Sequence, residues 1–240
     1  MLLCVDFHQR GLFIQSLFVT LISAGAIALT AAVPAQAVVI ESFDSGSYGA
    51  AWTVNVTPTI TAGAAHDGAF GVADNNAAWA YRTDVTVNTG DTLSAWVRPG
   101  SGRFYLGFGA SAGGASSFVI APSTGDIGFQ NNPGYFFNSL NTSSFSFVPN
   151  KWYLASVTFG SNVTGNLYDS DGTTLLASLV ASGLTNTTGG GVAVRSFHGV
   201  AFDTISLSGA VPEPASRALM IVGFGLVGVS MRRRKVALAA

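Results

Sequence analysis

Cysteine is almost missing from this chain, whose 240 residues include only Cys4, near the N-terminus. A single cysteine has no partner within the chain, so an intramolecular disulfide is excluded. Histidine is also scarce, because only His66 and His198 lie beyond residue 37. Two scattered histidines do not make a zinc site. Packing of side chains, or a bound ion, must therefore stabilise the fold.

Charged residues are few, at 10% of the chain, and they are unevenly spread. Residues 38–210 hold five basic and ten acidic side chains, a net charge of −5. A mildly acidic body without a basic stripe argues against nucleic acid as a partner. It also argues against an anionic polysaccharide held mainly by charge. Neutral glycans remain compatible with this composition. The basic residues are Arg82, Arg98, Arg103, Lys151 and Arg195.

The patterns of common hydrolases are absent from residues 38–210. Glycosidases place two carboxylates across the sugar, and the body has one glutamate, Glu41, and no strand that alternates acidic residues. The segment 109–113 matches the G-x-S-x-G pattern around Ser111. A nucleophile elbow needs a helix after its serine, whereas residues 116–120 read as a strand. The sequence therefore predicts no catalytic residues, and we expect no enzyme.

The N-terminus has the pattern of a secretory signal peptide. Arg10 precedes an apolar run from Leu12 to Val33, and Ala35 and Ala37 supply the small-x-small pattern before a cleavage site. We expect residues 1–37 to form a signal helix that signal peptidase removes after Ala37. An uncleaved membrane anchor is the alternative, because the apolar run is long. In either case the sequence predicts that the body is exported.

The C-terminus combines three short features: Pro212-Glu213-Pro214, an uncharged run over 218–231, and the basic cluster 232–235. A helix of fourteen residues covers about 21 Å, against about 30 Å of hydrocarbon. We therefore expect a short transmembrane helix that is marginal as an anchor. The basic cluster, which includes Arg232, Arg233 and Arg234, would hold its end on the cytoplasmic side. Residues 236–240 would form a tail.

Residues 211–235 resemble the PEP-CTERM sorting signal of Gram-negative bacteria, in a proteobacterial variant. Pro212, Glu213 and Pro214, the Gly-rich apolar helix and the arginines carry the resemblance, while Arg217 stands where that variant usually has Trp. The resemblance implies processing by a membrane-embedded exosortase and delivery to the cell surface or the extracellular matrix. An ordinary weak membrane anchor is the alternative.

Residues 38–210 read as strands and turns almost throughout. Four segments alternate apolar and polar residues in the manner of half-buried strands, and Gly, Asn, Ser and Thr clusters separate such segments. No long amphipathic helical pattern interrupts them. The sequence predicts one all-β domain, a two-sheet antiparallel β-sandwich of jelly-roll topology. The four segments are 91–97, 103–108, 151–159 and 200–207.

The body also resembles laminin-G-like and concanavalin-A-like jelly rolls, a fold shared with carbohydrate-binding modules. The resemblance rests on short motifs, among them 42–44, 65–68, 90–98, 151–153, 166–172 and 202–205. It implies a structural calcium ion held by Asp44, the Asp67 loop and Asp203. The alternative is that these aspartates are ordinary turn residues or backbone partners. A second acidic pair, Asp169 and Asp171, lacks the rest of a calcium loop, and a hairpin turn at Gly172 is favoured there.

Aromatic residues supply the candidate ligand site. The segment 131–138 places Tyr135, Phe136 and Phe137 among asparagines, which suits stacking on a sugar and hydrogen bonding to its hydroxyls. Trp79 and Tyr81 share one strand face and form a weaker candidate. Packing within the sandwich is the alternative for all five. Two functions stay open: a surface protein that binds a neutral polysaccharide, or a structural matrix protein with protein partners.

Overall fold

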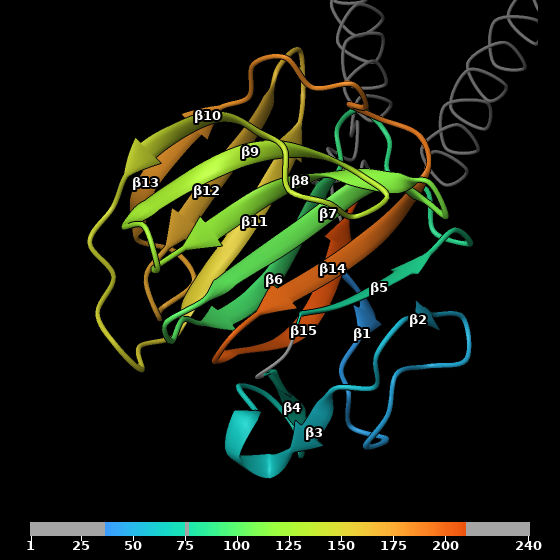
Figure 1. Cartoon of the computed structure of the whole chain (residues 1–240), viewed down its shortest axis with the longest axis vertical. Coiled ribbons are helices and arrows are strands. Elements are labelled where there is room, and N and C mark those ends of the chain that lie inside the picture. The colour runs from blue at the N-terminus through green and yellow to red at the C-terminus, as the bar shows by residue number, and fades with distance from the viewer. Residues whose placement is uncertain (1–36, 75–76, 210–240) are drawn as a thin grey trace, which may run out of the picture. The chain divides into compact units, whose positions relative to one another are not determined.

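The computed structural model describes residues 37–74 and 77–209, which form two antiparallel sheets packed face to face (Figure 1). The predicted all-β sandwich is confirmed. The predicted signal helix, the C-terminal transmembrane helix, the sorting signal and the tail lie outside the described residues. Within the described ranges, no helix has the length and apolar character needed to cross a membrane.

One sheet has eight strands, seven of which follow one another in space, with β1 beside β15 as well. All its strand pairs are antiparallel. A single turn of 3-10 helix, Ala62–Ala64, connects β3 to β4. The strands in spatial order are β13 (Leu175–Val180), β12 (Val163–Tyr168), β11 (Tyr153–Phe159), β6 (Thr92–Arg98), β15 (Val200–Ser208), β4 (Gly71–Asp74) and β3 (Thr59–Thr61), and β1 is Val38–Glu41.

The other sheet has seven strands, also antiparallel throughout. Its centre is formed by β7 and β8, which Figure 1 shows in green in front of the eight-stranded sheet. The spatial order is β10 (Ser139–Ser144), β9 (Asp126–Pro133), β8 (Gly114–Ala121), β7 (Arg103–Ser111), β14 (Gly191–Phe197), β5 (Ala78–Arg82) and β2 (Thr53–Val54).

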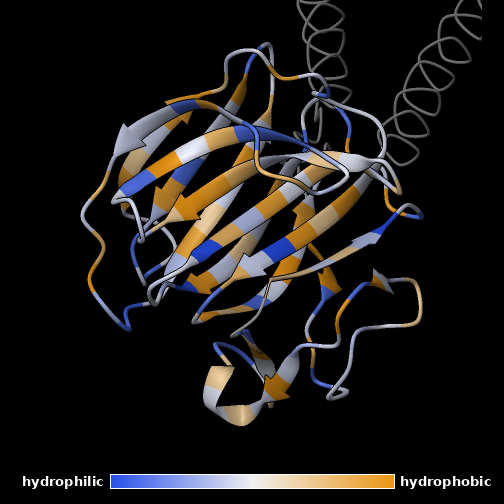
Figure 2. Cartoon of the chain, in the orientation of Figure 1, coloured by the Kyte–Doolittle hydropathy of each residue, from blue (hydrophilic) through white to orange (hydrophobic). Residues whose placement is uncertain are grey.

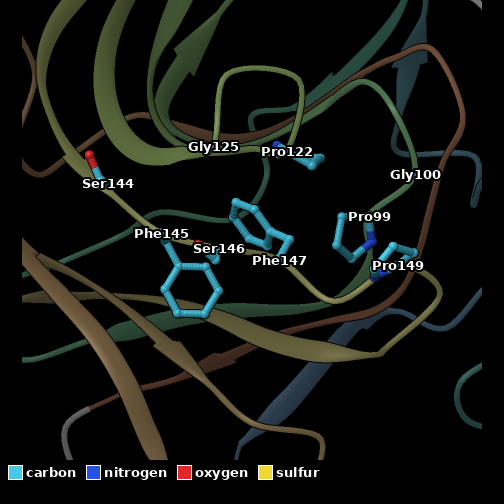
Figure 3. A pocket seen from close by; sticks show the side chains of 9 residues that line it. All are labelled: Pro99, Gly100, Pro122, Gly125, Ser144, Phe145, Ser146, Phe147 and Pro149. Atoms are coloured by element: carbon cyan, nitrogen blue, oxygen red, sulfur yellow. The ribbon is translucent and has the colours of Figure 1, made fainter.

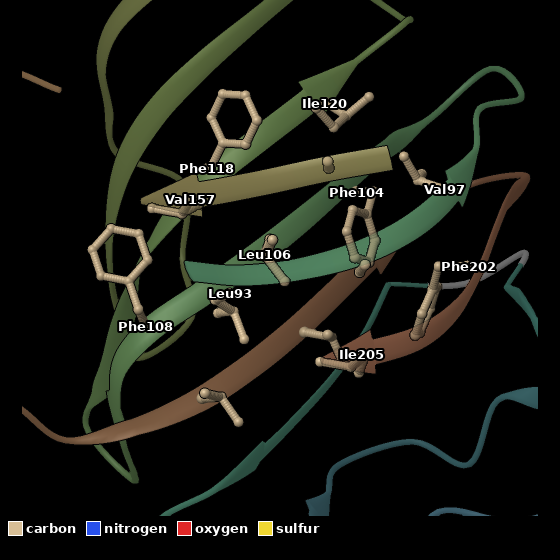
Figure 4. Packing of buried hydrophobic residues seen from close by; sticks show 14 of the residues in the cluster. Leu93, Val97, Phe104, Leu106, Phe108, Phe118, Ile120, Val157, Phe202 and Ile205 are labelled. Carbon is tan, nitrogen blue, oxygen red and sulfur yellow. The ribbon is translucent and has the colours of Figure 1, made fainter. Parts of the chain in front are cut away.

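The strands form where the period of two in the sequence lets one face be buried. In β6 every second residue, Leu93, Ala95 and Val97, is fully buried, while the residues between them are half-buried. Figure 2 shows the same alternation as bands of hydrophobic and hydrophilic colour along the strands. Side chains from both sheets meet between them, including Phe104, Phe118 and Phe202, as Figure 4 shows. Each such ring contributes about 1.5–3 kcal/mol by leaving water.

The outer face of the seven-stranded sheet is sheltered as well, since all eight residues of β8 are buried. On this face lie Tyr105, Val119 and Ala121, which pack together in a small cluster of their own. The connection between β9 and β10 runs in front of this face in the view of Figure 1. This connection is the aromatic segment singled out from the sequence, so the fold places it over the sheet.

Candidate ligand-binding site

The connection from β9 to β10 has a defined conformation. Gly134 and Tyr135 both have left-handed backbone angles, with φ of 57° and 65°. The Phe136 amide donates to the Pro133 carbonyl, at 3.1 Å, and the Asn132 side-chain amide donates to the Phe136 carbonyl, at 2.9 Å. A left-handed tyrosine is strained, so the surrounding contacts must hold it there. The turn therefore presents its side chains in fixed directions.

Tyr135 is turned inward against the sheet. Its ring is only 4% exposed and stacks on Trp79, with centroids 4.4 Å apart and planes 8° apart. The Tyr81 ring also stacks on the Tyr135 ring, with centroids 5.9 Å apart. The Tyr135 hydroxyl donates to the Ser111 carbonyl at 2.9 Å, and burial raises the pKa of Tyr135. These contacts favour the packing alternative for Tyr135, Trp79 and Tyr81.

Phe136 and Phe137 point the other way. Their side chains are 74% and 59% exposed, the two most exposed phenylalanine rings among the described residues. The guanidinium of Arg103 lies 5.4 Å from the centre of the Phe137 ring. Adjacent exposed rings leave apolar surface in water, which is the usual property of a contact site for a ligand or partner. The structure thus separates the three predicted aromatics into one packing ring and two free rings.

A pocket of about 250 Å³ opens beside the same turn. It is rich in amides and hydroxyls, and its walls come from the β7–β8 hairpin, from both ends of the turn and from the connection between β13 and β14. We call it the asparagine pocket. The polar side chains that line it belong to Ser111, Asn131, Asn132, Asn138, Thr185 and Asn186.

Asn132, which lines this pocket, has one unpaired acceptor among the described residues. Its Nδ2 donates to Gln130 Oε1 at 3.0 Å and to the Phe136 carbonyl, but its buried Oδ1 has no partner within the described part of the chain. Asn131, by contrast, is fully engaged, because its Oδ1 accepts from Ser116 and Thr185. Asn132 itself is 2% exposed. A buried acceptor without a donor is costly, so it marks a position where a hydroxyl would be favoured.

Sequence reasoning named only part of this pocket. The segment 131–138 was predicted as a site, but Thr185 and Asn186 lie about fifty residues further along the chain. No motif in the sequence marks either of them. They reach the pocket because the β13–β14 connection crosses from one sheet to the other.

The aspartates predicted to hold calcium do lie around one loop. Asp203 Oδ2 accepts from the amides of His66 and Asp67, at 2.8 and 3.0 Å, and its Oδ1 accepts from Thr204 at 2.7 Å. Asp44 Oδ1 accepts from the amide of Ala69 at 2.6 Å. Asp203 is fully buried, and this burial raises its pKa while the backbone hydrogen bonds oppose the rise. Both carboxylates therefore already hold the loop 66–69 in place.

Asp44, Asp67 and Asp203 do not form a cluster of three carboxylates that could bind calcium. The Asp67 side chain lies against His66, with its Oδ1 3.1 Å from His66 Nδ1. No group of three or more metal-ligating side chains occurs in the ranges that the structure describes. Backbone amides, which a cation would repel, occupy the Asp203 oxygens. Calcium binding stays a prediction.

The remaining sequence motifs have structural roles. Residues 169–172 form the β12–β13 hairpin turn, with Gly172 at φ of 68°, as predicted. Ser111 ends β7 and the next strand begins at Gly114, so no helix follows it. His198 is exposed in the turn between β14 and β15, with φ of 50°.

A second pocket, of about 320 Å³, lies at the other end of the sandwich (Figure 3). Three prolines, Phe145 and Phe147 form much of its wall. Its polar side chains are only Ser144 and Ser146. With so few hydrogen-bonding groups it is the weaker candidate for a polar ligand.

Comparison with known proteins gives two findings. Residues 210–235 match the PEP-CTERM protein-sorting motif, and this range contains all six predicted sorting residues. Among solved structures, a carbohydrate-binding module, CBM66, from Bacillus subtilis is similar at 14% identity and a TM-score of 0.50, over 66% of this chain and 95% of that one. No curated protein matches the chain.

Two further structures have lower TM-scores. Domain 4 of AbnA, an extracellular arabinanase from Geobacillus stearothermophilus in complex with arabinotriose, aligns at 12% identity and a TM-score of 0.49, over 74% and 94% of the two chains. The galectin LEC-6 from Caenorhabditis elegans aligns at 14% and 0.37, over 51% and 84%.

The first of these similarities supports the fold, and the motif indicates export and sorting to the cell surface. The motif also implies processing by an exosortase. The chain thus combines a β-sandwich body with a C-terminal PEP-CTERM protein-sorting motif.

Proposed function

We propose that the exported body binds a glycan at the asparagine pocket and at the two free rings beside it. The observation that carries the proposal is the buried, unpartnered Oδ1 of Asn132 in an amide-lined pocket. A sugar hydroxyl is a hydrogen-bond donor and would pair with such an acceptor. The pocket is polar on several sides, so more than one hydroxyl can be bonded at once.

The neighbouring phenylalanines supply the second half of sugar recognition. The apolar face of a sugar ring stacks on aromatic rings, and Phe136 and Phe137 are exposed between Pro133 and Asn138, two residues of the pocket wall. A ligand that covers these rings would remove their apolar surface from water, while its hydroxyls reach the amides. The rigid turn around Tyr135 means that little backbone ordering would be needed on binding.

The proposed function fits the sorting signal. A glycan-binding domain delivered to the cell surface would tether polysaccharide there or in the surrounding matrix. The similarity to a structure named as a carbohydrate-binding module supports only the fold. The proposal therefore rests on the pocket and on the exposed rings.

The test is binding of the purified mature protein to a panel of neutral polysaccharides, by affinity electrophoresis and calorimetry. We expect the double variant Phe136→Ala and Phe137→Ala to bind at least tenfold more weakly. Leu175→Ala is the matched control, because Leu175 is 53% exposed on the edge strand β13, away from the turn. If no glycan binds, or if the double variant and the control bind alike, the proposal is wrong and the structural matrix role gains support.

A further inference from the structure

Arg195 differs from the other basic residues of the body, because residues 37–74 and 77–209 supply no polar partner for it. Arg82 and Lys151 pair with Asp84 and Asp169, Arg98 donates to the Gly63 carbonyl, and Arg103 donates to Ser123. For Arg195 the described part of the chain provides neither a carboxylate nor a hydrogen-bond acceptor. Its Nη1 is buried and unpaired. Such a donor is costly to bury, so it marks a position where an acceptor from a ligand would be favoured.

The position of Arg195 is central on the outer face of the seven-stranded sheet. It lies in β14, with Trp79 of β5 opposite on one side and Tyr105 of β7 opposite on the other. Figure 1 shows β14 between these two strands. The guanidinium carbon lies 4.9 Å from the centre of the Tyr105 ring. The cation therefore lies against the Tyr105 ring, on a strand position paired with Trp79.

This face continues into the proposed glycan site. Trp79 stacks on Tyr135, the buried ring of the β9–β10 turn. Arg103, two residues before Tyr105 on the same strand face, approaches the exposed ring of Phe137. A chain of sugars lying on Phe136 and Phe137 would therefore run toward Arg195.

We propose that the glycan carries a carboxylate, as a uronic acid residue does, and that Arg195 binds this carboxylate. This inference rests on the proposed function. A guanidinium matches a carboxylate with two parallel hydrogen bonds, and the flanking rings suit the sugar that bears it. The net charge of −5 over residues 38–210 would repel a dense polyanion. The ligand class that fits both observations is a polysaccharide with single carboxylated residues among neutral ones.

The probes are a neutral oligosaccharide that bears one uronic acid residue and the methyl ester of the same oligosaccharide, which has the same rings without the charge. Calorimetry with the purified mature protein should show at least tenfold tighter binding of the acid form. Arg195→Gln should remove this preference, and Arg195→Lys should recover only part of it, because lysine keeps the charge without the paired donors. Arg98→Gln is the matched control, since Arg98 lies in β6 of the other sheet. Equal binding of acid and ester by the native protein would overturn the inference, as would unchanged acid binding in Arg195→Gln.

The outcomes also separate this inference from the proposed function. If neutral glycans bind and depend on Phe136 and Phe137, but the acid form has no advantage, only the carboxylate assignment fails. If neither neutral nor acidic glycans bind, both proposals fail. If Arg195→Gln does not fold, as judged by its thermal melting, the comparison of Arg195→Lys with the native protein decides the matter.

Discussion

At the residue scale, one carboxylate links the beginning and the end of the body. Asp203 in β15 accepts the amides of His66 and Asp67, which lie more than 130 residues earlier. Its neighbour Thr204 has φ of 45°, a strained value for a β-branched residue. The hydrogen bonds of Asp203 help to offset this strain, so the residue is a fixed point of the fold.

Replacing Asp203 by asparagine should therefore destabilise the protein by about 1–3 kcal/mol, because hydrogen bonds to a charged acceptor are lost. Urea denaturation at neutral pH would measure this change. The series should be run both in calcium and in a chelator. An equal loss in the two media supports the amide-binding role of Asp203. A loss confined to the calcium series would show that the residue holds an ion instead.

Tyr135 gives a prediction for alkaline pH. Burial, followed by the proximity of Tyr81, raises its pKa above the ordinary value of 10.0. Between pH 10 and the raised pKa of the folded protein, the unfolded tyrosine has lost its proton while the folded one keeps it. The free energy of unfolding therefore falls as pH rises above about 10. Tyr135→Phe should show a shallower fall in denaturation experiments between pH 9 and pH 11. Parallel curves for the variant and the native protein would contradict this assignment.

At the element scale, close approach of strands decides which residues are allowed. Gly165 in β12 faces Phe118 in β8 of the other sheet, and a Cβ at this glycine would lie 2.4 Å from the ring. The sequence offers no sign of this contact, since a glycine in a strand usually suggests a bulge. Here the glycine makes room for a core ring.

Gly165→Ala should consequently cost about 1–3 kcal/mol through overpacking of the core. Gly160→Ala is the matched control, because a Cβ there meets nothing nearer than 3.6 Å. Both variants would be compared by urea denaturation. The overpacking explanation is lost if Gly165→Ala is as stable as Gly160→Ala.

At the scale of the whole molecule, the segment that directs sorting and the domain that carries the proposed binding site are different parts of the chain. The sorting motif at 210–235 addresses the protein to the surface, and the sandwich carries the proposed ligand site. This separation means that each can be altered without the other. It also means that failure of delivery and failure of binding give different phenotypes.

Replacing Pro212, Glu213 and Pro214 together by alanine should stop sorting without unfolding the body. We expect the unprocessed protein to stay with the cell membrane, while glycan binding by the extracted protein is unchanged. Fractionation of cells and medium, followed by gel electrophoresis, would measure this. Normal surface delivery of the triple variant would show that these residues do not direct sorting.

The sequence by itself determined the fold class and the sorting signal. Alternating apolar residues predicted the strands that became β6, β7, β11 and β15 within three residues at their ends, because period-two patterning is a local property. The sorting signal is likewise read from contiguous residues, and its match confirms it. Prediction was weaker where β9 extends through Asn132 to Pro133, because asparagine has a low strand propensity and only sheet pairing overrides it.

Only the tertiary structure decided which candidates form a site. Tyr135 and Phe136 are neighbours of similar chemistry, yet one packs on Trp79 and the other is exposed, because the left-handed turn sends them in opposite directions. Thr185 enters the pocket of Asn132 through the path of the chain between sheets, and the unpaired state of Arg195 depends on what lies opposite it in neighbouring strands. Burial and pairing across distant strands are properties of the folded chain, so no local pattern of residues encodes them.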